Sequence, residues 1–355
     1  MSNKGFIGKE RFEETFIHQV DDNGRIKQIE YLFTKKFGDS DDLLPIEKDR
    51  YRIVWMPGCP YANKTVITWK LLGLDNVISL AQASIIRSKR GWVFGPELLD
   101  DEIDPNLGKY QSVDPVLGVH YLHDIYLRSH PSYEGRSTVP TIVDVKTGFA
   151  ANNDHMNIPT YFARDWKRFH KKGAPELYPI ELRDEIDKLN DWIWKRINKG
   201  AYAAGFAKSQ EEYDEGYEKF FEALDILEER LSKSRFLFGD HITLSDIHLY
   251  VTLIRFYQTY YNIFLVNKKR LDEYDALFGY ARDLYSIPEF KEYTKLDLIK
   301  KHYQLSTHLR AKFGNEYGIY AIGPDESKWE LPNDRDLLAK DKNIFIREVE
   351  WYGRL

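Results

Sequence analysis

The segment YRIVWMPGCPYANKTVITWKLLGL, residues 51–74, decides the fold. Residues 51–56 are β-branched and aromatic, which is typical of a short buried strand. After a Pro-Gly pair the apolar spacing changes to three or four residues, as on one face of a helix, at Ala62, Val66, Trp69 and Leu72. Pro60 suits the first helical position. The segment therefore predicts a strand followed at once by a helix, with Cys59 at the N-cap.

Cys59 is the only cysteine in the 355 residues, so an intramolecular disulfide is excluded. A lone cysteine is most often a small buried hydrophobic residue. At a helix N-cap, however, the sulfur faces unpaired N–H groups and the positive end of the helix dipole. Both favour the thiolate, so we expect a pKa below the usual value of about 8.5. Asn63 and Lys64 in the first turn can add donors or positive charge.

These features favour a nucleophilic role for Cys59. The chain has no second cysteine that could resolve an oxidised or conjugated Cys59. The resolving thiol must then come from outside, which indicates a small-molecule thiol as cosubstrate.

The rest of the chain divides into an α/β part and a helical part. The run STVPTIVD, residues 137–144, predicts a second strand, and its Val139-Pro140 bond is a possible cis site. From Glu176 onward the apolar spacing is helical, and Thr243 with Asp246 forms a capping-box pattern. We predict an extension at 1–50, an α/β domain at 51–165, a helical domain at 175–324 and a tail at 325–355.

Composition narrows the classes of function. Lys and Arg number 51 and Asp and Glu 56, so 51 − 56 gives a net charge of −5, which argues against a nucleic-acid binder. No apolar run approaches the roughly 18 to 20 residues of a membrane span. The start of the chain has no signal-peptide pattern, so we expect a cytoplasmic location. We interpret His120, His123 and Asp124 as polar surface, and therefore expect no metal site.

Several separated motifs, in order, resemble the glutathionyl-hydroquinone reductases, also called the xi-class glutathione transferases. The resemblance covers about residues 25–335. Its motifs are GCPYA (58–62), GWVF (91–94), GRSTVP (135–140), GAYAAGFA (200–207), HY (302–303) and IGP (322–324).

The resemblance implies a thioredoxin-like α/β N-terminal domain followed by an all-α C-terminal domain, and a homodimer formed through the helical domain. It implies glutathione as cosubstrate and a small aromatic or quinol substrate. Cys59 would attack the sulfur of a glutathionyl-hydroquinone, and a second thiol would resolve the mixed disulfide. Tyr202 and Tyr303 would be the catalytic tyrosines, although most tyrosines in a helical domain belong to its core or rim. The implied thiol-binding residues are Tyr61, Trp92, Arg136, Val139, Pro140, Asp154 and His155.

Four positions depart from the family pattern. The family has Trp where this chain has Tyr61, and Arg where it has Lys64. A Glu-Ser pair that grips the γ-glutamyl end is replaced by Asp154-His155. We therefore expect weaker glutathione binding, and another low-molecular-weight thiol stays open as cosubstrate.

Two other functions stay open at this point. The first is an omega-type thioltransferase that acts on small mixed disulfides or dehydroascorbate. It would use Cys59 but would not need the tyrosines. The second is a non-catalytic, transferase-like module that mediates assembly, which predicts no thiol binding at all. The Cys-Pro pair at a helix start argues against this second reading.

Overall fold

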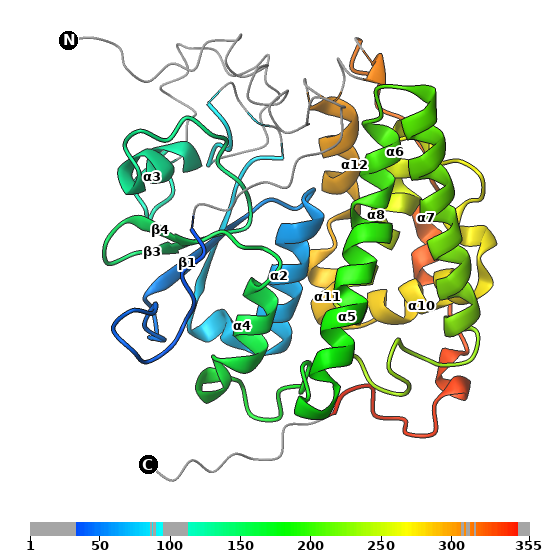
Figure 1. Cartoon of the computed structure of the whole chain (residues 1–355), viewed down its shortest axis with the longest axis horizontal. Helices are drawn as coiled ribbons and strands as arrows, with labels where there is room; N and C mark the ends of the chain where they lie inside the picture. Colours follow the sequence, from blue (N-terminus) through cyan, green and yellow to red (C-terminus); the bar gives the residue numbers. More distant parts are fainter. Residues whose placement is uncertain are drawn as a thin grey trace. The chain divides into compact units, whose positions relative to one another are not determined.

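The structure is a computed structural model that describes residues 33–85, 87, 90–94, 113–306, 309, 313–315 and 317–346. Most of the predicted N-terminal extension and the end of the predicted tail lie outside these residues. The chain forms two compact units (Figure 1). The first unit comprises residues 1–62, 75–158 and 297–321, and the second comprises residues 63–74, 159–296 and 322–355.

The first unit contains a four-stranded mixed sheet with strand order β2-β1-β3-β4. Its strands are β1 (Tyr51–Trp55), β2 (Ser79–Gln82), β3 (Thr141–Asp144) and β4 (Phe149–Asn152). β1 runs parallel to β2 and antiparallel to β3, and β3 runs antiparallel to β4. Both central strands are wholly buried, which is why their apolar runs are readable in the sequence. The edge strands β2 and β4 are short and partly polar, and the sequence did not predict them.

Among the described residues, two helices and the beginning of a third, up to Ala62, belong to the first unit. α2 (Pro60–Leu71) begins at Pro60, so Cys59 directly precedes it, as the sequence predicts. α3 (Leu122–Ser129) lies beside β4 (Figure 1), where the Ala150 N–H donates to Ser129 Oγ at 2.7 Å. α12 (Leu296–Leu305) carries Tyr303. Almost all of α12 belongs to this unit although it follows the helical part of the chain; the predicted domain boundaries stay a prediction.

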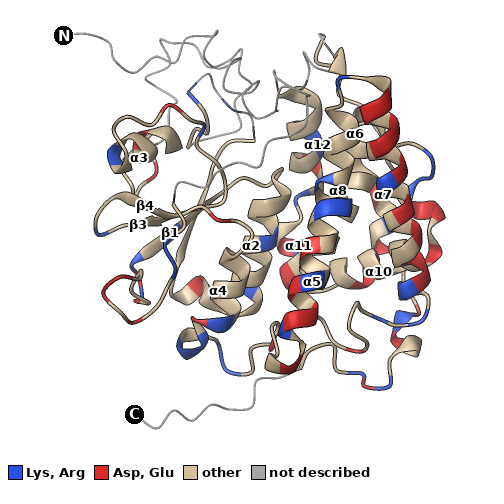
Figure 2. Ribbon diagram, in the orientation of Figure 1, with Lys and Arg blue, Asp and Glu red and all other residues tan. Residues whose placement is uncertain are grey.

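The second unit is built from helices, which confirms an all-α part after the α/β part. Its main helices are α4 (Ile158–Arg164), α5 (Arg183–Ile193), α6 (Gly200–Gly205), α7 (Gln210–Leu231), α8 (Leu244–Arg255), α9 (Tyr261–Ile263), α10 (Asp275–Tyr285) and α11 (Pro288–Tyr293). Two π-helical turns, Trp194–Asn198 and Phe256–Tyr260, follow α5 and α8. Acidic residues recur along α7 (Figure 2), and the helix buries Phe220, Phe221, Leu224 and Leu227. Across the described residues, no helix is both long and apolar enough to cross a membrane.

The start of α8 confirms the predicted capping box. The Asp246 carboxylate accepts the Thr243 N–H at 2.8 Å, and the Thr243 side chain caps the helix in return. The same carboxylate accepts the Leu237 N–H at 2.9 Å and the Tyr280 O–H at 3.0 Å. Asp246 is fully buried, and these bonds satisfy its oxygens. The motif therefore specifies folding of this unit.

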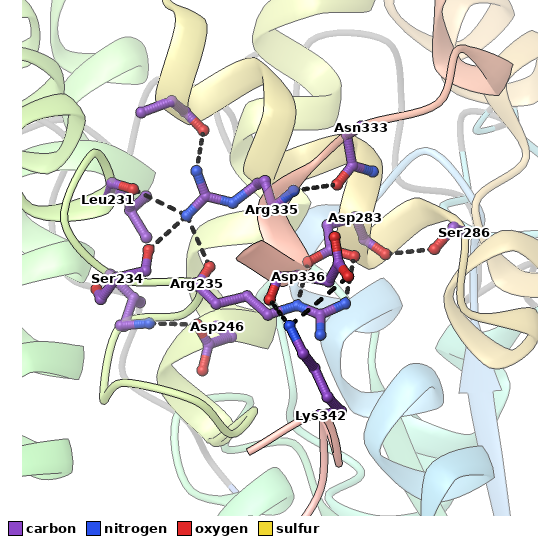
Figure 3. Close-up of polar contacts among 12 residues, drawn as sticks. Leu231, Ser234, Arg235, Asp246, Asp283, Ser286, Asn333, Arg335, Asp336 and Lys342 are labelled. Carbon is purple, nitrogen blue, oxygen red and sulfur yellow. Dashed lines mark hydrogen bonds and ion pairs between the residues drawn. The ribbon is translucent and has the colours of Figure 1, made fainter. Parts of the chain in front are cut away.

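The C-terminal segment is attached to the helical unit through Arg335, in the short 3₁₀ turn Arg335–Leu338. Its buried guanidinium donates to the main-chain oxygens of Leu231 at 2.9 Å, Arg235 at 2.8 Å and Ala276 at 3.3 Å, and to that of Ser234 (Figure 3). One arginine thus satisfies four carbonyl groups where α7 ends and α10 begins. Because the acceptors are neutral, desolvation dominates and lowers the pKa of Arg335 below its usual value.

Arg335→Ala is expected to lower the free energy of unfolding by about 3 kcal/mol, because it leaves several buried carbonyls without a donor. Lys342→Ala is the matched control. Lys342 is another cation of the same segment that donates to a main-chain oxygen, that of Asp336 at 2.6 Å, but it is exposed. Its removal should change stability by less than about 0.5 kcal/mol. Urea denaturation of the full chain measures both, and equal effects would contradict the anchoring role of Arg335.

Candidate functional site

Cys59 lies in a tight turn between β1 and α2. Its N–H donates to Met56 O at 3.0 Å, and the Gly58 N–H donates to the Met56 sulfur at 2.9 Å. Cys59 is a free cysteine and is only partly buried. Its Sγ lies 3.4 Å from the carbonyl oxygen of Val139, to which the protonated thiol can donate. The structure therefore brings Cys59 against the loop that contains Val139 and Pro140.

The Val139-Pro140 peptide bond is cis, as the sequence suggested. The Val139 N–H has no hydrogen-bond partner in the described part of the chain, although the Val139 side chain is buried. Buried main-chain N–H groups are almost always paired in a complete assembly. The loop therefore offers one main-chain donor close to the Cys59 sulfur, which fits an extended peptide such as glutathione.

Trp92 supplies a second donor in the same unit. Its side chain is 5% exposed, and its Nε1–H has no partner within the described residues. The ring lies 5.2 Å from the Arg87 guanidinium and 6.1 Å from the His302 ring. An acceptor on a bound ligand would satisfy this N–H group. These residues thus fit a peptide-like thiol, whose carbonyl and carboxylate oxygens are acceptors.

Two departures from the family pattern contact each other. The rings of Tyr61 and His155 stack with centroids 4.3 Å apart and planes 9° from parallel. The neighbouring Asp154 carboxylate accepts the Met156 N–H at 3.2 Å and the Asn157 side-chain amide at 2.6 Å. His155 therefore lies against the first turn of α2, while the Asp154 carboxylate bonds to residues just before α4. Their predicted roles in thiol binding stay predictions.

Arg136 is held through its main chain. The Tyr133 hydroxyl donates to Arg136 O at 2.8 Å. Burial raises the pKa of Tyr133 above its usual value, which keeps this hydroxyl protonated. A Cβ atom on Gly135 would lie 2.6 Å from the Tyr133 hydroxyl oxygen, so a larger residue here would displace the Tyr133 side chain. The Tyr133 side chain therefore supports the turn that leads into the Val139 loop.

α12 brings Tyr303 into the same unit as Cys59, and Tyr303 is 4% exposed. The preceding residue, His302, lies against the Cys59 turn: a Cβ atom on Gly58 would be 2.6 Å from the Cβ of His302. The His302 ring nitrogen Nδ1 lies 2.5 Å from Ile85 O. The sequence motif HY does not by itself indicate that His302 lies against the Cys59 turn, because the contact joins residues far apart in the chain.

Tyr202 belongs to the second unit, so the structure does not place it beside Cys59. Its hydroxyl lies 3.2 Å from that of Tyr260, and its ring contacts the rings of Phe206 and Phe264. Tyr260, in the π-helical turn after α8, escaped sequence reasoning because only the folded chain brings it to Tyr202. The catalytic role of Tyr202 stays a prediction.

The sequence suggested that Asn63 and Lys64, in the first turn of α2, could add donors or positive charge near Cys59. The Asn63 amide donates to Tyr293 O at 2.9 Å and accepts from the Arg255 guanidinium at 3.3 Å, both within the second unit. Lys64 is 2% exposed.

Within the described residues, no three or more His, Cys, Asp and Glu side chains are grouped to hold a metal ion.

Comparison with known proteins places this site in context. Residues 210–283 match the family model described as glutathione S-transferase, C-terminal domain. The chain is 37% identical to the glutathionyl-hydroquinone reductase YqjG of Escherichia coli, over 82% of this chain and 84% of that protein. It is 33% identical to the glutathione S-transferase omega-like 2 of Schizosaccharomyces pombe, over 85% of this chain and 94% of that protein. The glutathione-bound structure of the E. coli YqjG superposes with a TM-score of 0.75, covering 86% of this chain and 96% of that one.

Proposed function

Because this chain belongs to the glutathionyl-hydroquinone reductases, the xi-class glutathione transferases, we propose that it reductively removes glutathione from a quinol ring. The protein is a glutathione transferase-like oxidoreductase, and the substrate and mechanism are the proposal. The observation that carries the mechanism is the Cys59 thiol at the start of α2, 3.4 Å from the carbonyl oxygen of Val139, whose N–H meets no partner among the residues that the structure describes.

The first proposed step uses the Cys59 thiolate, which the start of α2 stabilises. The thiolate attacks the sulfur of the thioether that joins glutathione to the ring. A sulfur–sulfur bond forms and the sulfur–carbon bond breaks, so its electron pair goes to the ring carbon. That carbon takes a proton, and hydroquinone leaves. Cys59 is oxidised to the mixed disulfide while the ring carbon is reduced.

The second proposed step regenerates the enzyme. A second glutathione thiolate attacks the glutathionyl sulfur on Cys59, which releases oxidised glutathione and the Cys59 thiolate. In sum, glutathionyl-hydroquinone and glutathione become hydroquinone and glutathione disulfide. The N–H groups of Val139 and Trp92, which find no partner within the described ranges, support binding of the peptide part of glutathione.

A proton donor near the ring would accelerate the first step, because charge develops on the leaving carbon. Tyr303 is the candidate in the same unit as Cys59, and Tyr202 is the candidate from the second unit. An omega-type thioltransferase is the second candidate function, favoured by the relative from Schizosaccharomyces pombe with omega-like in its name. It would use Cys59 and the same thiol-binding loop without needing either tyrosine.

A single-turnover experiment tests the proposal. The protein is mixed with one equivalent of glutathionyl-hydroquinone, without added thiol, and followed by intact mass and chromatography. We expect the mass to rise by one glutathionyl group as one equivalent of hydroquinone appears. Added glutathione should then restore the original mass and release glutathione disulfide. An unmodified protein, or an adduct that contains the ring, would contradict the mechanism.

A further inference from the structure

A buried hydroxyl pair behind the Val139 loop carries a further inference, which rests on the proposed function. We propose that Tyr126 and Thr141 are positioning residues that orient the Val139 N–H toward the thiol substrate. Tyr126 comes from α3 and Thr141 is the first residue of β3. Both side chains are completely buried, so neither touches a ligand itself.

The shortest contacts of the Tyr126 hydroxyl define a chain of hydrogen bonds, and Thr138 Oγ1 at 3.1 Å and Thr138 O at 3.4 Å are more distant acceptors. The Tyr126 oxygen accepts the Thr138 N–H at 3.2 Å and the Asn153 side-chain amide at 3.1 Å. Its own O–H then donates, and its nearest acceptor is Thr141 Oγ1 at 2.8 Å. Thr141 in turn donates to the main-chain oxygen of Thr138 at 2.6 Å. Every hydroxyl in this chain of bonds therefore has a partner.

The second end of the network is fixed as well. Asn153 exchanges hydrogen bonds with Phe33: the Asn153 N–H donates to Phe33 O at 2.8 Å, and the Phe33 N–H donates to Asn153 Oδ1 at 3.1 Å. The Asn153 amide that reaches Tyr126 therefore cannot rotate freely. The network is a rigid support rather than a set of adjustable side chains.

The peptide group between Thr138 and Val139 connects the buried hydrogen bonds of Tyr126 and Thr141 to the Val139 N–H. The Thr138 oxygen and the Val139 N–H belong to one planar peptide unit, in which the two bonds point in opposite directions. Thr141 holds the Thr138 oxygen on the buried side of the loop. The Val139 N–H therefore points away from the network, and within the described residues it meets no acceptor. Two hydroxyl groups thus set the direction of a donor that neither of them touches.

The positioning role predicts a specific loss of thiol binding. Thr141→Val keeps the shape of the side chain and removes the hydroxyl, whereas Thr141→Ser keeps the hydroxyl. We expect Thr141→Val and Tyr126→Phe to weaken glutathione binding by about tenfold, the equivalent of roughly one ligand hydrogen bond. Thr141→Ser should bind within about twofold of the parent protein. Calorimetric titration of glutathione into each variant, in a Cys59→Ser background, measures this.

Tyr51→Phe is the matched control. Tyr51 is an equally buried tyrosine of the same unit, and its hydroxyl donates to Pro45 O at 2.8 Å, outside this network. It should lose thermal stability without losing glutathione affinity. Unchanged affinity in Thr141→Val and Tyr126→Phe would overturn the inference, as would an equal loss in Tyr51→Phe. If the parent protein binds no glutathione, the proposed function fails instead. If Tyr126→Phe does not fold, the comparison of Thr141→Val with Thr141→Ser decides alone.

Discussion

Cys59→Ser is expected to lower glutathionyl-hydroquinone reductase turnover by about 10³-fold or more, because a hydroxyl cannot form the mixed disulfide. Serine keeps the size of the side chain and its position before Pro60, so the fold should be retained. The residual rate is compared with that of the parent protein under saturating glutathione. Thermal unfolding of both proteins shows whether the loss is chemical.

Two further readouts make this result decisive. The parent protein should accept one iodoacetamide group, at Cys59, and lose activity in proportion, because Cys59 is the only thiol in the chain. Glutathione should still bind to Cys59→Ser, since Val139 and Trp92 are intact. Retained turnover in Cys59→Ser, or full activity after alkylation, would show that another group is the nucleophile.

Tyr303→Phe and Tyr202→Phe are expected to reduce turnover of glutathionyl-hydroquinone by about 10²-fold or more if either tyrosine acts as the general acid. Breaking the bond between sulfur and the ring leaves a carbon that needs a proton. Opening a simple mixed disulfide has no such demand. Disulfide exchange by the same variants should therefore change little. Measuring both substrates with each variant separates a reductase from an omega-type thioltransferase.

Tyr274→Phe is the control for Tyr202→Phe. Tyr274 is a buried tyrosine of the second unit whose hydroxyl bonds to the Asp225 carboxylate at 3.2 Å. Its loss should lower stability without distinguishing the two substrates. If Tyr202→Phe and Tyr303→Phe slow both reactions equally, the tyrosines only shape the pocket. That result would favour the thioltransferase.

The contact between Tyr61 and His155 also bears on the thiol. The substitution of Asp154-His155 for the family's Glu-Ser pair predicts weaker glutathione binding, and the structure adds that His155 stacks on Tyr61. A histidine ring engaged in stacking is held in one orientation, whereas a serine hydroxyl can rotate to meet a ligand. Tyr61 and His155 therefore form one stacked pair. Both should be substituted together when the specificity for the thiol is measured.

The sequence by itself determined those features whose cause is local. The strand at 51–55 and the helix from Pro60 are visible because apolar spacing follows the period of each element. The place of Cys59 directly before a helix that begins at Pro60 is likewise readable from neighbouring residues, and it is the basis for proposing Cys59 as the nucleophile. The capping box of Thr243 and Asp246 is likewise complete within one helical turn. The family resemblance depends on such short motifs in a fixed order.

Only the tertiary structure decided which distant segments meet. The contact of His302 with Gly58, the stack of Tyr61 on His155 and the four carbonyls held by Arg335 join residues far apart in the chain. The same applies to the Tyr126 hydroxyl, whose partners come from two other segments. A hydroxyl, an imidazole or a guanidinium can bond to many different acceptors with similar energy. Its partner is therefore set by the packing of the apolar core around it, and not by the residues beside it in the sequence.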